Sequence, residues 1–301
     1  MRFPGNKKAG LIIMVDAEGE FGRIPFSPRD KFSKRVKMLL SAILGMDYSI
    51  KTLNEMVVLL KKYNIPATFF FVGSLFLKKG DKKILTGYLN QDIKTRYLWN
   101  KRRLPKIIPS FGGFIQNEMN SRLFEVSIHN FLHESNFSEP DSIISNSIRF
   151  SRIAAKRIGF DPKTYAAPWF ELEEPKRPDR IYNILKNNGI ILTRFDGTRE
   201  KYGTVITQRT KKGFFKRRGF NCIHSSYFIK TGIRNRKELE IIENGIKDAI
   251  KTGTIYTLST HETTFMRHGL NHFEDILKII KKYQKDLYMN TLYGMFLKVG
   301  K

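Results

Sequence analysis

The chain has 301 residues, of which 41% are hydrophobic, and this is enough apolar material for one large α/β domain or two small ones. Lysine and arginine outnumber aspartate and glutamate 54 to 28, so the formal net charge is +26 and anionic partners are favoured. The apolar runs fall short of the roughly 18 to 20 residues that span a bilayer, so we expect no transmembrane helix.

The N-terminus is basic, but the apolar run after it ends at Asp16, before it reaches the roughly 7 to 15 residues of a signal-peptide core. We therefore expect a cytoplasmic protein, with a peripheral place at the inner face of the membrane as an alternative. The single cysteine, Cys222, excludes an internal disulfide and offers no framework for a thiolate metal site. We expect it to be a buried free thiol.

Short apolar runs alternate with amphipathic helical stretches along most of the chain. Several of the helical stretches are followed by glycine, a common helix stop because it adopts positive φ without strain. In chain order the pattern predicts strand 11–15, helix 49–64, strand 67–72, strand 125–128, helix 141–158, strand 164–167, helix 179–188, strand 190–193, helix 237–252, strand 254–259 and helix 271–283.

Strands that are apolar throughout and alternate with helices favour an α/β protein with a parallel sheet covered by helices on its outer side. A (β/α) barrel fits this length in one domain. No internal repeat or low-complexity linker divides the sequence, so we expect a single domain over residues 1–301.

Three basic segments, residues 26–48, 78–109 and 199–218, interrupt the alternation. Their lysines and arginines are interleaved with Phe, Leu and Ile, which suits an anionic membrane surface, where each cation adds about 1 kcal/mol of binding. Solvated loops of a lysine-rich protein are the alternative interpretation. These insertions are therefore candidates for contact with a membrane or with a phosphate-bearing carrier.

Polar residues follow the ends of five predicted strands. In a parallel barrel these ends meet at one rim, so the side chains should converge there. His129 and His133 are four positions apart, and on a helical turn they would share one face, at the separation that a common metal ion needs. Two imidazoles and one carboxylate leave coordination positions open for water and substrate, and imidazole suits zinc, iron, cobalt and nickel alike.

Two alternatives to this metal pair remain open. A bare pair of histidines four apart is often solvated surface. His268 and His272 have the same spacing, but they straddle Gly269 in a loop that no strand feeds, and we expect a surface role for them.

The order of segments resembles the NodB-homology polysaccharide deacetylases, carbohydrate esterase family 4, over residues 11–293 or so. Five short motifs, in this order and spacing, carry the resemblance: Val15-Asp-Ala-Glu18, Ile65-Pro-Ala-Thr-Phe-Phe-Phe-Val-Gly73, His129-Asn-Phe-Leu-His133, Tyr165-Ala-Ala-Pro-Trp169 and Leu258-Ser-Thr-His261. It implies an irregular (β/α) barrel of the NodB-homology type, here with basic insertions.

The resemblance also implies a reaction, the hydrolysis of a linear amide that removes an acetyl or formyl group from an N-acylated amino sugar. Asp16 would be the general base and His261 the general acid. One divalent metal ion would be held by Glu18, His129 and His133, with zinc as the first choice and cobalt, nickel, iron or manganese as alternatives.

Four further rim residues are candidates for substrate binding. Trp169 could stack on a sugar ring, Arg194 and Asp196 could orient a hydroxyl or phosphate, and Glu262 lies beside the predicted acid. A salt bridge and a core aromatic are the alternative interpretation of the first three, and Glu262 could instead orient His261.

The chain departs from the family pattern at two places. Ala17 separates Asp16 from the acidic metal ligand, where the common motif has adjacent aspartates. Ala166 stands where an arginine usually holds the base, and Arg194 is a candidate replacement. Both features look like the branch that deformylates formamido-arabinose on undecaprenyl phosphate, so a lipid- or nucleotide-phosphate-linked sugar is a candidate substrate.

Two rival functions remain. The charge alone suits a protein that binds nucleic acid or another acidic surface, but binding does not require acids and histidines to converge at strand ends, so nucleic acid is the less favoured partner. A catalytically silent barrel that binds sugar is the other rival, and the missing arginine is its support.

Overall fold

The computed structural model describes residues 2–19, 48–78, 80–90, 111–196, 213–229, 231–266 and 268–300. Within these ranges one sheet contains ten strands: β1 (Ala9–Ala17), β2 (Ala67–Phe71), β3 (Phe124–Ile128), β4 (Thr164–Ala166), β5 (Leu192–Phe195), β6 (Phe214–Arg217), β7 (Phe220–His224), β8 (Tyr227–Phe228), β9 (Ile255–His261) and β10 (Leu287–Met289). The α-helices are α2 (Tyr48–Tyr63), α3 (Lys82–Leu89), α5 (Gly112–Glu118), α6 (Asp141–Arg157), α7 (Arg180–Asn187), α8 (Arg236–Thr252), α9 (Asn271–Lys282) and α10 (Leu292–Val299).

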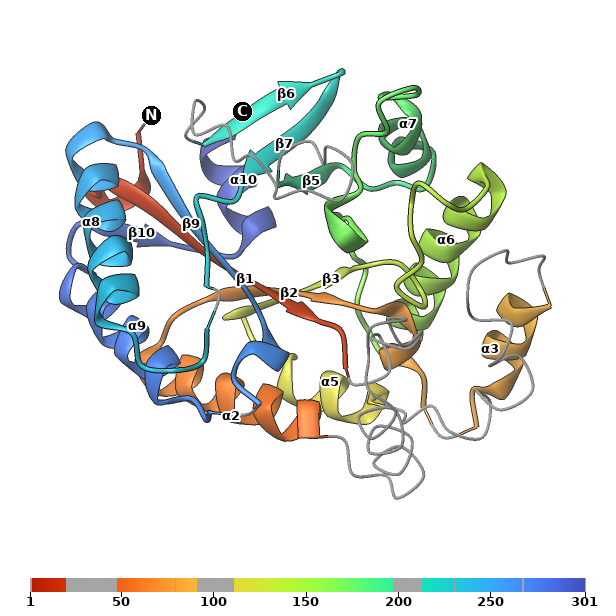
Figure 1. The fold of residues 1–301 in the computed structure, drawn as a ribbon, viewed down its shortest axis with the longest axis horizontal. Helices are drawn as coiled ribbons and strands as arrows, with labels where there is room; N and C mark the ends of the chain where they lie inside the picture. Colours follow the sequence, from red (N-terminus) through yellow and green to blue (C-terminus); the bar gives the residue numbers. More distant parts are fainter. Residues whose placement is uncertain are drawn as a thin grey trace.

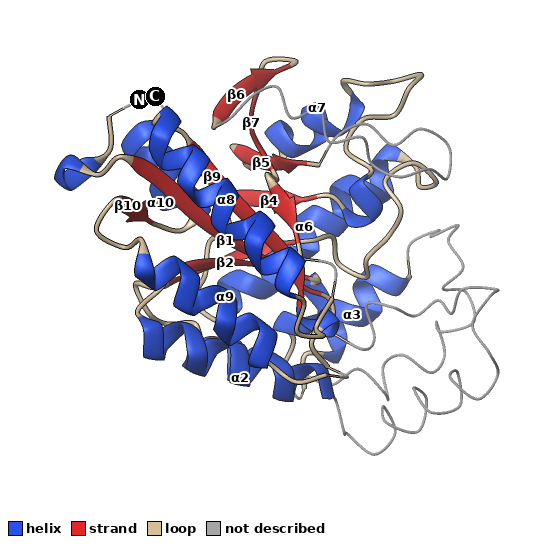
Figure 2. Ribbon diagram, turned by 60° about the vertical axis from the view of Figure 1, so that its left-hand side comes forward, coloured by secondary structure: helices blue, strands red, loops and turns tan. Residues whose placement is uncertain are grey.

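The sheet follows the order β6-β7-β5-β4-β3-β2-β1-β9-β8, and β10 pairs with the start of β1. Every described strand pair is parallel except the β6–β7 hairpin. The helices surround the strands, with α2, α9 and α8 side by side along one flank (Figures 1 and 2). This arrangement confirms the predicted α/β class and the irregular (β/α) barrel, with the carboxyl ends of its strands at one rim.

Strand β1 shows how the barrel is filled. Its side chains alternate between two apolar clusters: Leu11 and Ile13 pack in the large cluster that includes the helices, whereas Ile12 and Met14 belong to a smaller one inside the barrel. Asp16 continues the inward-facing series. Because successive side chains of a strand point to opposite faces, Asp16 brings an acidic group into the barrel interior at the rim.

Helix α10 closes the opposite end of the barrel, where it contributes Leu292 to the inner apolar cluster. Its first backbone N–H groups bind polar side chains of the strands: Leu292 N donates to Thr68 Oγ1 at 2.7 Å, and Tyr293 N donates to Glu125 Oε2 at 2.7 Å. A helix N-terminus leaves such N–H groups without intrahelical partners and favours a nearby carboxylate. Glu125 is therefore part of a partly buried cap that joins α10 to the barrel.

The predicted elements are present with shifts of a few residues at their ends. The largest shifts are of two residues: β5 spans Leu192–Phe195 rather than 190–193, β1 spans Ala9–Ala17 rather than 11–15, and β9 ends at His261 rather than at residue 259. The sequence patterns did not predict α3, α5, α10, β7, β8 or β10, and β6 falls in a predicted basic insertion. Residues 20–47, 91–110 and 197–212, which hold most of the predicted basic insertions, lie outside the described residues.

The described end of the third basic segment is a strand and its turn. Arg217 Nη2 lies 2.6 Å from Glu173 Oε2, and Arg218 Nη1 lies 3.2 Å from Asp179 Oδ1. These two cations are thus paired with acids of the loop before α7, and they offer less free charge to a membrane than the sequence indicates. Among the described helices, none combines the length and apolar character needed to cross a bilayer.

The predicted buried thiol is confirmed, because Cys222 on β7 is free and fully buried. Burial raises the pKa of Cys222 to about 12, so the thiol stays protonated at pH values well below 12.

We predict that iodoacetamide at pH 8 does not alkylate Cys222 in the native protein and that it alkylates Cys222 readily in 6 M guanidinium chloride. Mass spectrometry measures the alkylated fraction. Rapid alkylation of the native chain would contradict this burial.

Candidate active site

The register of β1 brings the predicted base and acid together. Asp16 lies opposite His261 on β9 and opposite Phe70 on β2. His261 Nε2 is 3.6 Å from Asp16 Oδ2 and 3.1 Å from Glu18 Oε1, the acid two positions further along the chain. Two acids and an imidazole from neighbouring parallel strands therefore share one place on the barrel rim.

Glu18, His129 and His133 form a buried cluster whose donor atoms all lie within 4.8 Å of one another. His129 Nε2 is 3.1 Å from His133 Nε2, and His133 Nε2 is 3.3 Å from Glu18 Oε1. Among the described residues, no other set of histidines, cysteines and acids has this spacing. One carboxylate and two imidazoles at this separation match the donor set of a catalytic metal site with open positions.

His129 is oriented as a metal ligand. Its Nδ1 lies 2.8 Å from the backbone oxygen of Ala166, to which the Nδ1–H group donates, and this leaves the lone pair of Nε2 facing Glu18 and His133. Burial lowers the pKa of His129 to about 4, so the ring is neutral near pH 7. Ala166 thus contributes its carbonyl group at the position where the sequence analysis noted a missing arginine.

The prediction that His129 and His133 lie on a helical turn is wrong. They lie in a loop after β3, and Asn130 and His133 have positive φ angles of 56° and 61°. The loop backbone bonds to other segments instead of forming a helical ladder: Asn130 O accepts from Gly73 N at 2.7 Å, and Phe131 N donates to the Ser147 hydroxyl at 2.7 Å. The loop curls both rings toward Glu18.

Buried side chains fix this curled loop. Asn130 Nδ2 donates to Glu134 O at 3.0 Å and to Asn136 Oδ1 at 2.9 Å, and Asn130 Oδ1 accepts from the Tyr165 hydroxyl at 2.8 Å. Both carboxylate oxygens of Glu134 accept from Leu132 N at 3.1 Å. Left-handed backbone costs roughly 1–3 kcal/mol per non-glycine residue, and such a network can hold it in place.

Arg194 lies behind Asp16 and is fully buried. Its Nη1 and Nη2 donate to Asp16 Oδ1 and Oδ2 at 2.6 and 2.7 Å, and its Nε donates to Asp196 Oδ2 at 2.8 Å. Burial alone would raise the pKa of Asp16, but the charge and hydrogen bonds of Arg194 outweigh it and hold this pKa below its ordinary value. Asp16 is therefore an ionised carboxylate in a fixed orientation.

The strand register explains how Arg194 reaches Asp16. Arg194 on β5 is paired with Ala166 on β4, so its guanidinium enters the barrel one strand away from the place of the usual arginine. All three nitrogen groups are engaged by Asp16 and Asp196, and we therefore interpret Arg194 as a positioning residue for Asp16 rather than a contact for substrate.

His261 is protonated at neutral pH in this arrangement. Burial alone would lower its pKa, but the carboxylates of Glu18, Asp16 and Glu262 raise it to about 9. Part of its side chain, 24%, is exposed. The imidazole can thus present a proton toward the open side of the site.

Among the four predicted substrate contacts, only the side chain of Trp169 is exposed to solvent. It is 47% exposed, whereas the other three, Arg194, Asp196 and Glu262, are at most 7% exposed. Its ring lies edge-on, 4.9 Å from that of His133, and its backbone has a φ of 57°. Glu262 accepts hydrogen bonds from the backbone N–H groups of Glu18 and Gly19, and its contact with substrate stays a prediction.

On the other side of the site, Phe228 makes an aromatic contact that the sequence patterns did not predict. The ring of Phe228 on β8 lies 5.0 Å from that of His261 and 5.9 Å from that of Phe170. No motif signals this contact, because β8 is two residues long and its place beside β9 is set by pairing between distant segments.

The rival pair of histidines does not form a site within the described part of the chain. His272 is fully buried, and its Nε2 lies 2.8 Å from Glu238 Oε2, whereas His268 is exposed. The predicted surface role is therefore wrong for His272, because the buried carboxylate of Glu238 on α8 is hydrogen-bonded to its ring.

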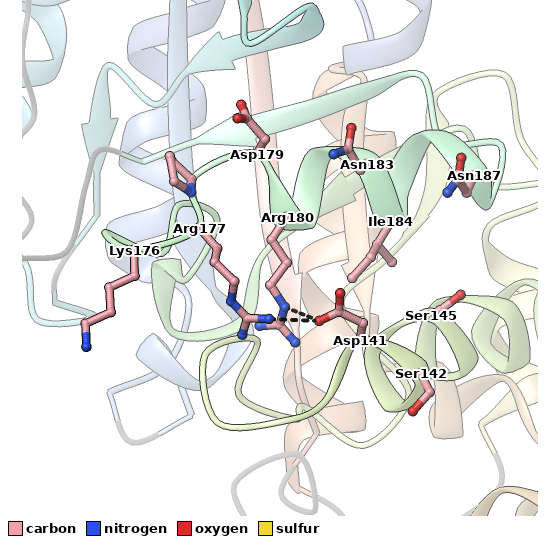
Figure 3. A pocket seen from close by; sticks show the side chains of 11 residues that line it. Asp141, Ser142, Ser145, Lys176, Arg177, Asp179, Arg180, Asn183, Ile184 and Asn187 are labelled. Carbon is pink, nitrogen blue, oxygen red and sulfur yellow. Dashed lines mark hydrogen bonds and ion pairs between the residues drawn. The ribbon is translucent and has the colours of Figure 1, made fainter.

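A groove of about 640 Å³ lies apart from the rim, between α6 and α7 (Figure 3). Arg177 and Arg180 converge there on Asp141 (Figure 3). Arg180 also donates to the backbone oxygens of Asn136 and Glu139, which follow the loop of His129 and His133. This side of the groove is thus an anchor for the loop beside the site.

The barrel fold is shared with solved structures of proteins named as polysaccharide deacetylases. A protein named as a polysaccharide deacetylase from Mycobacterium smegmatis is 13% identical, with a TM-score of 0.65, and the match covers 100% of this chain and 93% of that one. A second protein so named, from Pseudomonas aeruginosa, is 10% identical (TM-score 0.57; 99% and 94% covered), and an allantoinase is 9% identical (TM-score 0.56; 99% and 94%). No protein-family model and no curated protein matches the sequence.

We predict that Arg194→Met lowers the free energy of unfolding by about 3–5 kcal/mol, because it leaves Asp16 buried without its cation. Asp16→Asn in the same chain should restore part of this loss, since the uncompensated charge is then gone. Urea unfolding of the wild type, both single variants and the double variant measures this coupling. Strictly additive losses would contradict a direct Arg194–Asp16 interaction.

Proposed function

We propose that the protein is a metal-dependent amide hydrolase that removes an acetyl or formyl group from an N-acylated amino sugar. The observation that carries this proposal is the cluster of Glu18, His129 and His133 beside Asp16 and His261 at the carboxyl rim of the barrel. The fold shared with polysaccharide deacetylases supports it, and we infer that the chain is a NodB-homology protein with a single domain over residues 1–301. Because an allantoinase has the same fold, the proposed reaction rests on the residues of the site and not on the barrel fold.

The residues fit a divalent ion in charge as well as in spacing. The described site contains the buried carboxylates Asp16, Glu18, Asp196 and Glu262 against one guanidinium and one imidazolium, so two formal negative charges remain. A divalent ion held by Glu18 and the two histidines would balance them. It would supply Lewis acidity for the water and for the amide carbonyl, and zinc is our first choice, with cobalt, nickel, iron or manganese as alternatives.

The protein's own groups provide the two proton transfers. Asp16, ionised and fixed by Arg194, accepts a proton from the water whose oxygen adds to the amide carbon. His261, protonated, donates a proton to the nitrogen as the C–N bond breaks, because an amide anion is a poor leaving group. The products are formate or acetate and a free amine.

We propose an amino sugar as the substrate class because an exposed aromatic ring, that of Trp169, flanks His133 at the rim, where it can stack on a pyranose. A phosphate-bearing lipid or nucleotide carrier agrees with the net charge of +26. We infer that the formamido-arabinose deformylase branch is the nearest in kind, from the split acidic motif and Ala166-Ala167. Contact with an anionic membrane surface remains part of this proposal.

The catalytically silent barrel is the weaker alternative. Its support was the arginine missing at Ala166, and Arg194 supplies a guanidinium to Asp16 from the next strand. A site with an ionised acid, a protonated imidazole and three metal donors is more than sugar binding requires.

We predict that the purified protein contains close to one equivalent of divalent metal and that a His129→Ala/His133→Ala variant contains almost none. Both rings carry donor atoms of the cluster, and their loss leaves a single carboxylate. Elemental analysis measures the metal, with His268→Ala as the control. Metal retained by the double variant of confirmed fold would move the site elsewhere.

We predict that Asp16→Asn reduces amide hydrolysis at least 100-fold, in line with the roughly 10²–10⁴-fold contribution of a general base, while metal content stays unchanged. The assay follows release of the free amine from N-formyl and N-acetyl amino sugars. A variant that keeps the wild-type rate would remove Asp16 from the role of base.

A further inference from the structure

Glu262 follows His261 at the start of a short 3-10 helix, Glu262–Thr264, and its side chain turns back toward β1. One carboxylate oxygen, Oε1, accepts hydrogen bonds from two successive backbone groups, Glu18 N at 3.0 Å and Gly19 N at 2.7 Å. The first of these hydrogen bonds joins residues 244 positions apart, and Glu18 and Glu262 are both buried residues. It is a fixed internal contact next to a candidate metal ligand.

Glu18 needs such a partner because the strand ladder ends before it. The last β1 residue, Ala17, pairs with Phe71, and its backbone oxygen accepts from Val72 N at 3.1 Å. The chain then turns at Gly19, whose φ is 68°. Within the described ranges no strand pairs with β1 beyond Ala17, and buried N–H groups left without an acceptor would cost about 1–3 kcal/mol each.

We propose that Glu262 is a positioning residue that holds the metal ligand Glu18 in place through its backbone. Two N–H groups bound to one oxygen fix the peptide planes on both sides of the Glu18 Cα, and this fixes the direction of its side chain. That side chain then places Oε1 3.3 Å from His133 Nε2 and 3.1 Å from His261 Nε2. The inference rests on the proposed metal site and deepens it.

The same contact gives a reason for the split acidic motif. An acid directly after Asp16 would point to the other face of the strand, because side chains alternate with a period of two. Moving the ligand to Glu18 returns it to the inner face but beyond the end of the ladder. A carboxylate acceptor is well suited to hold it there, since hydrogen bonds to an ionised group are roughly twice as strong as neutral ones.

The test is zinc affinity, measured by competition with a chelating dye for Glu262→Gln, Glu262→Asp and Glu262→Leu. Positioning predicts that Gln, whose amide oxygen keeps the reach and the acceptor, stays within a factor of about three of wild type, because the two hydrogen bonds survive. Asp is a methylene too short, and Leu has no acceptor, so both should weaken zinc binding by roughly 10- to 100-fold, as the loss of outer-shell partners does.

The opposite order would overturn the proposal. If Glu262 acts only through its charge, Asp binds zinc like wild type while Gln and Leu are equally weak. Unchanged affinity in all three variants would also overturn it. Asp and Gln are the decisive pair if Leu does not fold.

Glu125→Leu is the matched control, because Glu125 is a partly buried carboxylate that also accepts a backbone N–H, from Tyr293 at 2.7 Å, at the other end of the barrel. It should lower stability and leave zinc affinity unchanged. If Glu125→Leu loses as much zinc affinity as Glu262→Leu, the loss in Glu262→Leu reflects general destabilisation of the fold, and the proposal is overturned.

His129→Ala measured in parallel separates the two levels of inference. Equal zinc binding by His129→Ala and wild type would reject the metal site and with it the proposed function. Loss of zinc in His129→Ala together with full affinity in Glu262→Asp and Glu262→Leu would reject only the role of Glu262.

Discussion

The buried ion pair between Arg194 and Asp16 is the interaction on which the candidate site depends. Taking both charges out of water is costly, and the cost is offset only when the geometry is good and every remaining donor is satisfied. Here both oxygens of Asp16 are bound and Asp196 accepts from Nε, so each of the three guanidinium nitrogens donates to a carboxylate. The Asp16 carboxylate therefore stays ionised and cannot rotate, as its proposed role as a general base requires.

The barrel uses the same physical device at both of its ends. At the closed end, Glu125 accepts the backbone N–H of Tyr293 in α10 and fastens the helix to the strands. At the open end, Glu262 accepts the N–H groups of Glu18 and Gly19. In each case a carboxylate, partly buried for Glu125 and fully buried for Glu262, holds a stretch of chain that the strand ladder does not reach. The difference lies in what is fixed: apolar Leu292 at one end, and a candidate metal ligand at the other.

The walls of the site differ in character from its floor. The floor is charged and buried, whereas Trp169 on one side and Phe228 on the other bring aromatic rings against His133 and His261. Apolar walls lower the local dielectric constant and strengthen the charge interactions of the reacting groups. The exposed ring of Trp169 is held with positive φ by the loop after β4, and such backbone strain is common where a side chain has a functional task.

Local patterns in the sequence were sufficient for much of this protein. Short apolar runs marked the strands, and polar residues at their ends marked the rim, because both signals depend on neighbours a few positions away. The tertiary structure alone decided the rest. Arg194 meets Asp16 across 178 positions through its register beside Ala166, and Glu262 meets Glu18 across 244. The loop of His129 and His133 is not helical because its backbone groups bind segments distant in the chain, and no local pattern encodes those partners.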